Sequence, residues 1–182
     1  FNRSALLFAG EDGVAAVSII MYLQFLCIGI YFGFSMGLST PLGYAYGDRN
    51  FSVCRVLEQY AYRFFAIAPI ILYGCTYLLA PIGVRFFASP GSTVFDMAVS
   101  GLRLYGLGFL FSGINIFAAI RMMTYGKGYI SGMITFLRSF ALLLLFLTVL
   151  PRFLELNGIW LAVPAAEILT LIVALWTLRK KL

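Results

Sequence analysis

About five long apolar segments, separated by short polar gaps, constrain this chain more than any other feature of its sequence. A helix that crosses a bilayer needs about 20 mostly apolar residues. The stretches that meet this requirement are 14–42, 62–84, 98–120, 129–150 and 158–178. They are too long for the strands of a barrel, and they do not alternate between apolar and polar residues with a period of two. The sequence therefore predicts an all-α integral membrane protein with about five transmembrane helices.

The composition excludes a soluble fold. Hydrophobic residues make up 62% of the 182-residue chain and charged residues only 11%, whereas a soluble domain carries about 25% charged residues. A globule of this composition could not cover its surface with polar side chains. We therefore expect the lipid bilayer to cover most of the surface.

Several function classes are excluded as well. Histidine is absent, which removes His-dependent catalysis and the commonest metal ligand. Neither an H-E-x-x-H nor a G-x-S-x-G motif occurs, so we expect no enzyme, no metal site and no cofactor. The net charge of +6 does not indicate a nucleic-acid partner, because the basic residues lie in the gaps between apolar runs rather than on one stripe.

The basic residues in the gaps predict how the helices are oriented. Cytoplasmic loops of membrane proteins carry an excess of Lys and Arg. The richer clusters here follow the first and third apolar segments and the last one: Arg49, Arg55 and Arg63; Arg121 and Lys127; Arg179, Lys180 and Lys181. We therefore expect a multi-pass protein of the cell (inner or plasma) membrane with a cytoplasmic C-terminus.

The first apolar segment carries small residues at a helical spacing. Gly29, Gly33 and Gly37, followed by Pro41, are four residues apart and share one helical face. Small residues at this spacing allow two helices to approach closely in lipid, so the face predicts a tight helix–helix seam or a hinge that bends during a transport cycle. Pro41 lacks an amide donor, and we expect the helix to kink or end near it.

Glu167 lies near the middle of the last apolar segment, one turn after Pro164. A lone ionised carboxylate at membrane depth costs about 2.5–3.5 kcal/mol or more, so it needs a partner, a proton or a water-filled cavity. Arg138 lies at a comparable depth in the preceding segment, and we expect the two side chains to pair. The pair could pin the helices together, or Glu167 could exchange a proton or bind a cation during transport.

Polar residues also occur inside other segments. Ser112 and Asn115 lie just past the middle of the third segment, and Gln24 and Tyr31 lie in the first. Each could form an interhelical hydrogen bond, worth about 0.6 kcal/mol on average. As an alternative, each could line a cavity that takes a cation or a drug.

Several stretches together resemble transporters of the MATE (multidrug and toxic compound extrusion) family. GEDGVAAVSIIMY and GFSMGLSTPLGYAYGDRN are similar to the eighth helix of that family and the cytoplasmic loop after it. FSGINIFAAIRMMTYGKG and SGMITFLRSF resemble the tenth and eleventh helices, and PRFLELNGIWLAVPAAEILTLIVALWTLRKK resembles the last helix. The resemblance covers essentially the whole chain, in order.

The resemblance implies a fold of twelve helices in two six-helix lobes, with residues 1–182 supplying most of the C-terminal lobe. Residues 1–10 would be the tail of a preceding helix that is otherwise missing, and the N-terminal lobe would be the main protein partner. The implied activity is export of organic cations or amphipathic drugs in exchange for H+ or Na+ by alternating access. Because such a cavity lies between two lobes, we expect residues 1–182 alone not to transport.

One departure from the family, one match to it and two other functions bear on this interpretation. Some members place an acid on the tenth helix, where this chain has only Ser112 and Asn115, and a Na+ site in this lobe is therefore doubtful. Glu167 matches an acidic position of the last helix. The alternatives are a lipid-linked sugar flippase of the same superfamily and a structural membrane protein that transports nothing. A flippase is expected to need several deep cationic side chains for a pyrophosphate, and only Arg138 is of this kind.

Overall fold

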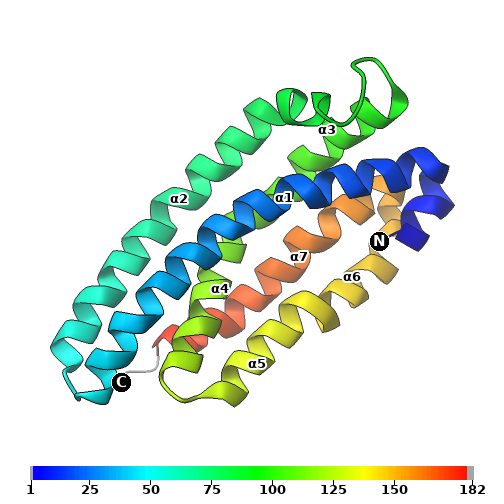
Figure 1. Ribbon diagram of the computed structural model, residues 1–182. Coiled ribbons are helices and arrows are strands. Elements are labelled where there is room, and N and C mark those ends of the chain that lie inside the picture. The colour runs from blue at the N-terminus through cyan, green and yellow to red at the C-terminus, as the bar shows by residue number, and fades with distance from the viewer. Residues whose placement is uncertain (1, 180–182) are drawn as a thin grey trace.

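The computed structural model describes residues 2–179, which form helices joined by short turns (Figure 1). In chain order the elements are α1 (Asn2–Gly47), α2 (Phe51–Arg85), α3 (Thr93–Tyr105), the 3-10 helix η1 (Gly106–Gly108), α4 (Phe109–Thr124), α5 (Gly128–Phe136), the π-helix η2 (Leu137–Ala141), α6 (Leu142–Val149) and α7 (Pro151–Arg179). Several of them continue one another without a turn, so α3–η1–α4 and α5–η2–α6 each make one long rod.

Five helical stretches are long and apolar enough to cross a membrane: Ser4–Gly47, Phe51–Arg85, Thr93–Thr124, Gly128–Val149 and Pro151–Arg179. This confirms the predicted all-α membrane fold with about five transmembrane helices. The second stretch begins at Phe51 rather than near residue 62. Hydropathy places its start too late, because its first turns, which hold Arg55 and Glu58, are helical but polar.

Successive rods run in opposite directions (Figure 1). The turns at 48–50 and 125–127 and the last turn of α7 lie at one end of the bundle, and the turns at 86–92 and 150–151 lie at the other. We call the first the basic end, because it carries Arg49, Lys127 and Arg179. A cytoplasmic location of this end remains a prediction, and Lys180 and Lys181 lie outside the described residues.

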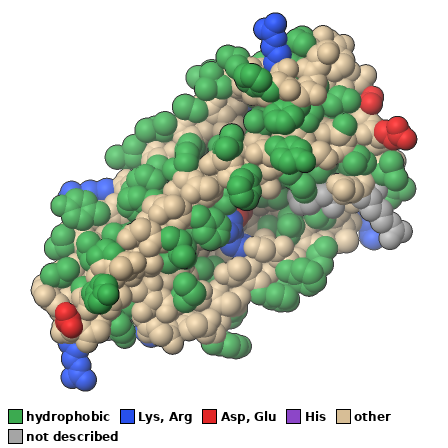
Figure 2. All heavy atoms as spheres, viewed as in Figure 1, with side chains coloured by type: hydrophobic (Ala, Val, Ile, Leu, Met, Phe, Trp, Pro, Cys, Tyr) green, Lys and Arg blue, Asp and Glu red, His purple; other side chains and the backbone are tan. Residues whose placement is uncertain are grey.

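The rod α3–η1–α4 forms the axis of the bundle. In its most apolar window 72% of the residues are buried, compared with 17% for α2 and 17% for α5–α6. Glycines on this rod allow its neighbours to approach: a Cβ added to Gly101 would lie 2.8 Å from both Ile20 and Trp160, and one added to Gly113 would lie 2.8 Å from Phe65. The outer helices expose many large apolar side chains (Figure 2), as lipid contact requires.

Two backbone irregularities bend the bundle at the end opposite the basic end. Gly10 has a φ of 61°, which suits glycine, and it turns residues 2–9 away from the long part of α1 (Figure 1). Glu155 has a φ of 48°, which is uncommon outside glycine. The turn at Glu155 brings Gly158 so near the preceding turn that an added Cβ would lie 2.5 Å from the Leu150 carbonyl oxygen. Segment 2–9 is helical, and its assignment to a preceding helix remains a prediction.

The predicted glycine seam is not formed between helices of the described residues. Gly29, Gly33 and Gly37 are exposed, and a Cβ added to any of them would meet no atom within 4 Å. Their face of α1 is turned away from the bundle, because Tyr31 and its neighbours on the opposite face fill the contact with α4. Pro41 is also exposed, and α1 continues through it to Gly47 rather than ending there. Transmembrane helices tolerate such a proline.

Candidate functional site

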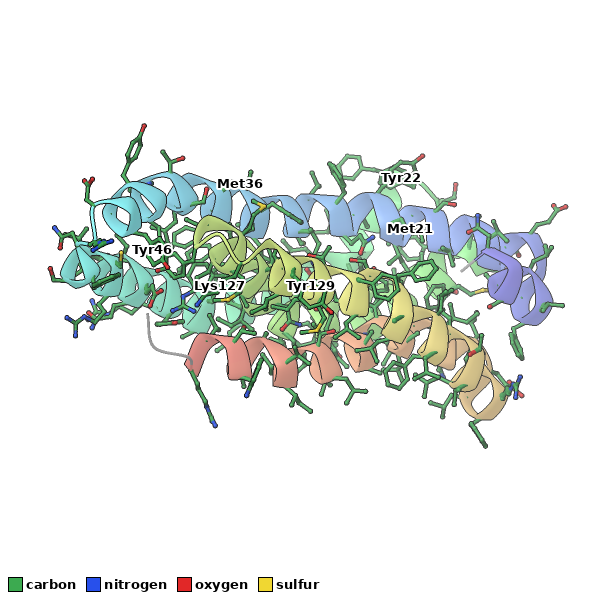
Figure 3. All side chains as sticks on the ribbon, turned by 90° about the horizontal axis from the view of Figure 1, so that it is seen from below. Met21, Tyr22, Met36, Tyr46, Lys127 and Tyr129 are labelled. Carbon is green, nitrogen blue, oxygen red and sulfur yellow. The ribbon has the colours of Figure 1, made fainter. Side chains whose placement is uncertain are left out.

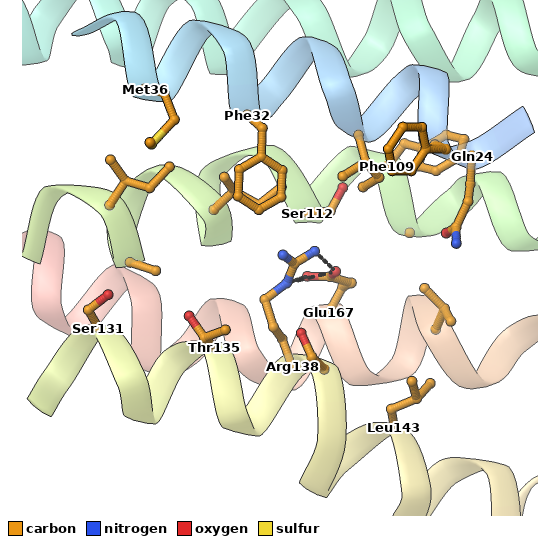
Figure 4. A pocket seen from close by; sticks show the side chains of 18 of the residues that line it. Gln24, Phe32, Met36, Phe109, Ser112, Ser131, Thr135, Arg138, Leu143 and Glu167 are labelled. Atoms are coloured by element: carbon orange, nitrogen blue, oxygen red, sulfur yellow. Dashed lines mark hydrogen bonds and ion pairs between the residues drawn. The ribbon is translucent and has the colours of Figure 1, made fainter. Parts of the chain in front are cut away.

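A cavity of about 590 Å³ lies in the middle of the bundle, between α1, α4, α7 and the α5–η2–α6 rod. We call it the central cavity. Figure 2 shows a hollow on this face with a basic side chain at its floor, and Figure 4 shows the lining from close by. Most lining side chains are apolar or aromatic, and a few are polar. The polar and charged ones are Gln24, Tyr105, Ser112, Ser131, Thr135, Arg138, Ser139 and Glu167.

Glu167 is the acidic group of the central cavity. It lies near the middle of α7, is 4% exposed, and follows Pro164, which is buried inside the same helix. Its carboxylate accepts from Arg138 on one side, with Nη2 2.5 Å and Nε 3.1 Å from Oε1. Asn115 Nδ2 donates from the other side, 2.7 Å from Oε2. The buried charge is thus both paired and hydrogen-bonded, which is the condition for keeping it ionised away from water.

Arg138 reaches the carboxylate from the π-helical turn η2 (Figure 4). Its side chain is 12% exposed, twice the 6% of the Glu167 side chain. Nε also lies 3.4 Å from Glu167 Oε2, so the guanidinium bridges both carboxylate oxygens. Single π turns inside α-helices occur often at functional sites. The pairing expected from matched depth is therefore present, and the role of the pair remains a proposal.

Asn115 and Ser112 lie three residues apart on α4, and both are buried. Asn115 Nδ2 also donates to the backbone oxygen of Glu167 at 2.9 Å, so a single amide fixes both the side chain and the backbone of that residue. Within residues 2–179, Ser112 Oγ and Asn115 Oδ1 have no hydrogen-bond partner. Ser112 lines the central cavity, while Asn115 lies behind the ion pair and is not part of the lining.

Gln24 and Tyr31, which the sequence placed together as cavity candidates, have different surroundings. Gln24 lines the central cavity and accepts a hydrogen bond from the Tyr105 hydroxyl. Tyr31 is fully buried in the core between α1 and α4, where its hydroxyl donates to the Phe109 carbonyl oxygen at 2.9 Å. Tyr31 is thus a packing residue rather than a lining residue, because the two faces of α1 differ and only one of them borders the cavity.

Three departures from regular α-helix surround the ion pair. They are η1 between α3 and α4, the π turn that carries Arg138, and Pro164 in α7. Two of them touch, since a Cβ added to Gly108 would lie 3.2 Å from Val163 Cγ1 and 3.5 Å from the Pro164 nitrogen. The backbone around Glu167 therefore departs from the regular α-helical hydrogen-bond pattern at three places.

The apolar part of the lining suits a large flat ligand. Phe25, Phe32 and Met36 of α1 line the central cavity together with Phe109 and Met123 of the axial rod. Figure 4 shows Phe32 and Met36 pointing from α1 toward α4. Aromatic faces attract organic cations, and methionine adapts to ligands of different shapes. Figure 3 shows the side chains along the bundle, with Met36 on α1 and Tyr129 on α5. Within residues 2–179, no cluster of His, Cys, Asp and Glu could hold a metal ion.

A second buried ion pair was not predicted from the sequence. Glu58 of α2 pairs with Arg121 of α4 near the basic end, and the Tyr125 hydroxyl donates to the same carboxylate at 2.6 Å. Arg121 also lies over the Tyr125 ring, 5.0 Å from its centroid, and donates to the Thr177 carbonyl oxygen of α7. Burial and the Glu58 carboxylate raise the pKa of the Tyr125 phenol.

The signal for this second pair was hidden because both residues were assigned to the polar gaps. Arg121 was counted as a loop residue, yet it is 2% exposed. Glu58 preceded the predicted start of its helix, although it is 7% exposed. If the second helix had been predicted to begin at residue 51, Glu58 and Arg121 would both have lain inside helices, at a similar distance from the basic end. This matched depth could have suggested that they pair.

Comparison with known proteins identifies the family. The sequence model of the family described as MatE matches residues 4–150, which is most of the chain. The chain belongs to the MATE family. No curated protein sequence matches this MATE chain significantly.

Solved structures show the same fold as this MATE chain. A multidrug resistance MATE family transporter of the MOP superfamily matches in its outward-facing conformation at 23% identity with a TM-score of 0.87, over 97% of this chain and 40% of that one. An inward-facing structure under the same description matches at 22% identity with a TM-score of 0.88, over 97% and 41%. A MOP superfamily transporter from Pyrococcus furiosus, described by a reversed polarity of its binding pocket, matches at 22% identity with a TM-score of 0.87, over 97% and 40%. The MATE chain thus spans about 40% of the length of the solved transporters it matches.

Proposed function

We propose that this chain is the C-terminal lobe of a secondary active antiporter that exports organic cations or amphipathic drugs in exchange for H+ or Na+. The observation that carries the proposal is Glu167, a buried carboxylate at the middle of its span that borders a large aromatic cavity. Ionisable groups at such depth are rare, and they mark ion and substrate pathways in membrane proteins. Glu167 is the group at which the coupling ion and the drug would compete.

The lining of the central cavity supports a cationic rather than an anionic substrate. Within residues 2–179, Arg138 is the only basic residue that lines the cavity, and its charge is balanced by Glu167. The cavity therefore offers no excess positive charge for a pyrophosphate, which a flippase would need. Phe25 and Phe32, which are 78% and 44% exposed, offer aromatic surface to a flat cation.

The two conformations matched by the chain support alternating access. The fold agrees equally well with the outward-facing and the inward-facing structure, with TM-scores of 0.87 and 0.88. A lobe that matches both states changes little between them, as expected when rigid lobes rock about a central site. An N-terminal lobe would supply the opposite wall of the cavity, and the basic end would face the cytoplasm of a cell-membrane protein.

Dye export from cells tests the proposal. The complete product of the gene that encodes these residues would be expressed in a host that lacks its own drug exporters. We expect faster export of ethidium than in cells with an empty vector, loss of the difference when the proton and sodium gradients are dissipated, and no export of an uncharged dye of similar size. Equal ethidium retention with and without the protein would overturn the proposal.

A further inference from the structure

The ion pair in the central cavity is held unequally on its two sides. Glu167 is fixed by Asn115 through two hydrogen bonds, 2.7 Å to the carboxylate and 2.9 Å to the backbone oxygen. Arg138, by contrast, donates only to Glu167 within residues 2–179, and its Nη1 has no partner there. The carboxylate therefore keeps a second partner when the arginine leaves, whereas the arginine has no other partner within residues 2–179.

The turn that carries Arg138 is also loosely packed. No residue of η2 is buried, and two of its residues, Ser139 and Phe140, are exposed. Asn115, on the other side of the carboxylate, belongs to the most buried rod of the bundle and is itself 0% exposed. An arginine side chain has a long flexible stem, so Arg138 can leave Glu167 without moving any buried residue.

The guanidinium of Arg138 has the chemistry of an organic cation. It is planar, its charge is delocalised, and it is more weakly hydrated than an ammonium group. It occupies the position beside the carboxylate in a cavity whose other lining side chains are mostly apolar or aromatic, with a few uncharged polar ones. A second cation cannot pair with Glu167 while Arg138 bridges both carboxylate oxygens.

We infer that Arg138 is a tethered competitor for the substrate: an organic cation binds Glu167 only by displacing the Arg138 side chain, which returns when the cation leaves. This inference rests on the proposed function and states how the same site selects its substrates. A cation must interact with Glu167 and the aromatic lining more favourably than the guanidinium does. Small, strongly hydrated ammonium ions are thereby rejected, because they lose their hydration and gain little contact with the aromatic lining.

Equilibrium binding of ethidium to the purified complete gene product in lipid nanodiscs tests this inference. The wild type and all variants would be measured in the same buffer. Arg138→Met removes the competing charge and keeps an apolar side chain, and we expect the Kd for ethidium to fall about tenfold. Arg138→Lys keeps a tethered cation, but one that is more strongly hydrated and cannot bridge both carboxylate oxygens, so its Kd should lie between the values of the wild type and Arg138→Met. Arg152→Met, at an exposed arginine in the first turn of α7, is the matched control and should leave the Kd unchanged.

The outcomes separate this inference from the function on which it rests. An unchanged or higher Kd in Arg138→Met, with ethidium still bound by the wild type, would overturn the tethered competitor alone. Absence of ethidium binding to the wild type and to every variant would overturn the proposed function as well. If Arg138→Met does not fold, Arg138→Gln removes the same charge and carries the same expectation.

Discussion

Glu167 can remain charged inside the bundle because two different groups bind its carboxylate. Arg138 supplies the opposite charge, and Asn115 supplies a neutral donor from the buried axis. Matched depth along two apolar segments was sufficient to predict the arginine. The contact between Asn115 and Glu167 could not be predicted in the same way. An asparagine in a transmembrane helix has many possible hydrogen-bond partners, and its depth in the membrane does not identify which of them it contacts.

Two neighbouring polar residues on α4 should differ in their effect on stability. Asn115→Ala removes both hydrogen bonds to Glu167 and should lower the free energy of unfolding by about 1–3 kcal/mol. Ser112→Ala removes a hydroxyl that has no partner within residues 2–179, so the change should stay within about 0.5 kcal/mol. Thermal unfolding in detergent measures both. A larger loss in Ser112→Ala than in Asn115→Ala would contradict the assigned contacts.

The second ion pair should matter for stability more than for transport. Arg121→Met leaves the Glu58 carboxylate buried without its cation, and breaking such a pair costs about 3–5 kcal/mol. The double variant Glu58→Gln/Arg121→Met should regain part of this loss, because no charge is then left unpaired. Denaturation of the purified single and double variants gives the comparison. A double variant less stable than either single variant would show that the pair is not the source of the effect.

At the scale of elements, some glycines lie where two helices are in close contact, and others lie where no neighbouring atom is near. Gly113→Ala on α4 would bring a methyl group within 2.8 Å of the Phe65 ring and 3.1 Å of the Tyr31 ring. We expect a loss of about 1–3 kcal/mol in stability from overpacking. Gly33→Ala on α1 meets no atom within 4 Å and should stabilise the helix by up to about 1 kcal/mol. Thermal unfolding of residues 1–182 compares the two, and equal effects would contradict the described packing.

Hydropathy predicted the elements well but not their internal irregularities. The five spans were visible because lipid requires about 20 apolar residues in each. The π turn at Leu137–Ala141 was not visible in the sequence. A single π turn and an α turn contain similar residue types, so hydropathy does not distinguish them over such a short stretch. The face of α1 that holds Gly29 and Gly33 was identified as a helical stripe, but the spacing could not show whether a neighbour in this chain covers it.

For the whole molecule, the proposed mechanism needs a second lobe. The central cavity lies between α1, α4, α7 and the α5–η2–α6 rod and opens as a hollow on one face of the bundle (Figure 2), so one lobe alone gives it walls on only part of its circumference. Residues 1–182 in lipid vesicles should therefore show no gradient-driven uptake of ethidium. Uptake by vesicles that hold only these residues would contradict a cavity between two lobes.

Gradient-driven uptake of an organic cation by Glu167→Gln in proteoliposomes tests the central claim most directly. Glutamine keeps the shape of the side chain and can still accept from Arg138 and Asn115. Because the Arg138 side chain lines the cavity and is 12% exposed, against 3% for Arg121, the complete gene product should assemble and lose less stability than Arg121→Met does. The account predicts that the wild type accumulates ethidium under an imposed H+ or Na+ gradient, that Glu167→Gln does not, and that Glu11→Gln at an exposed carboxylate matches the wild type. If Glu167→Gln accumulates ethidium as well as the wild type does, the carboxylate has no coupling role. Loss of expression of Glu167→Gln would also contradict the account, because it would indicate a static ion pair that only holds the helices together.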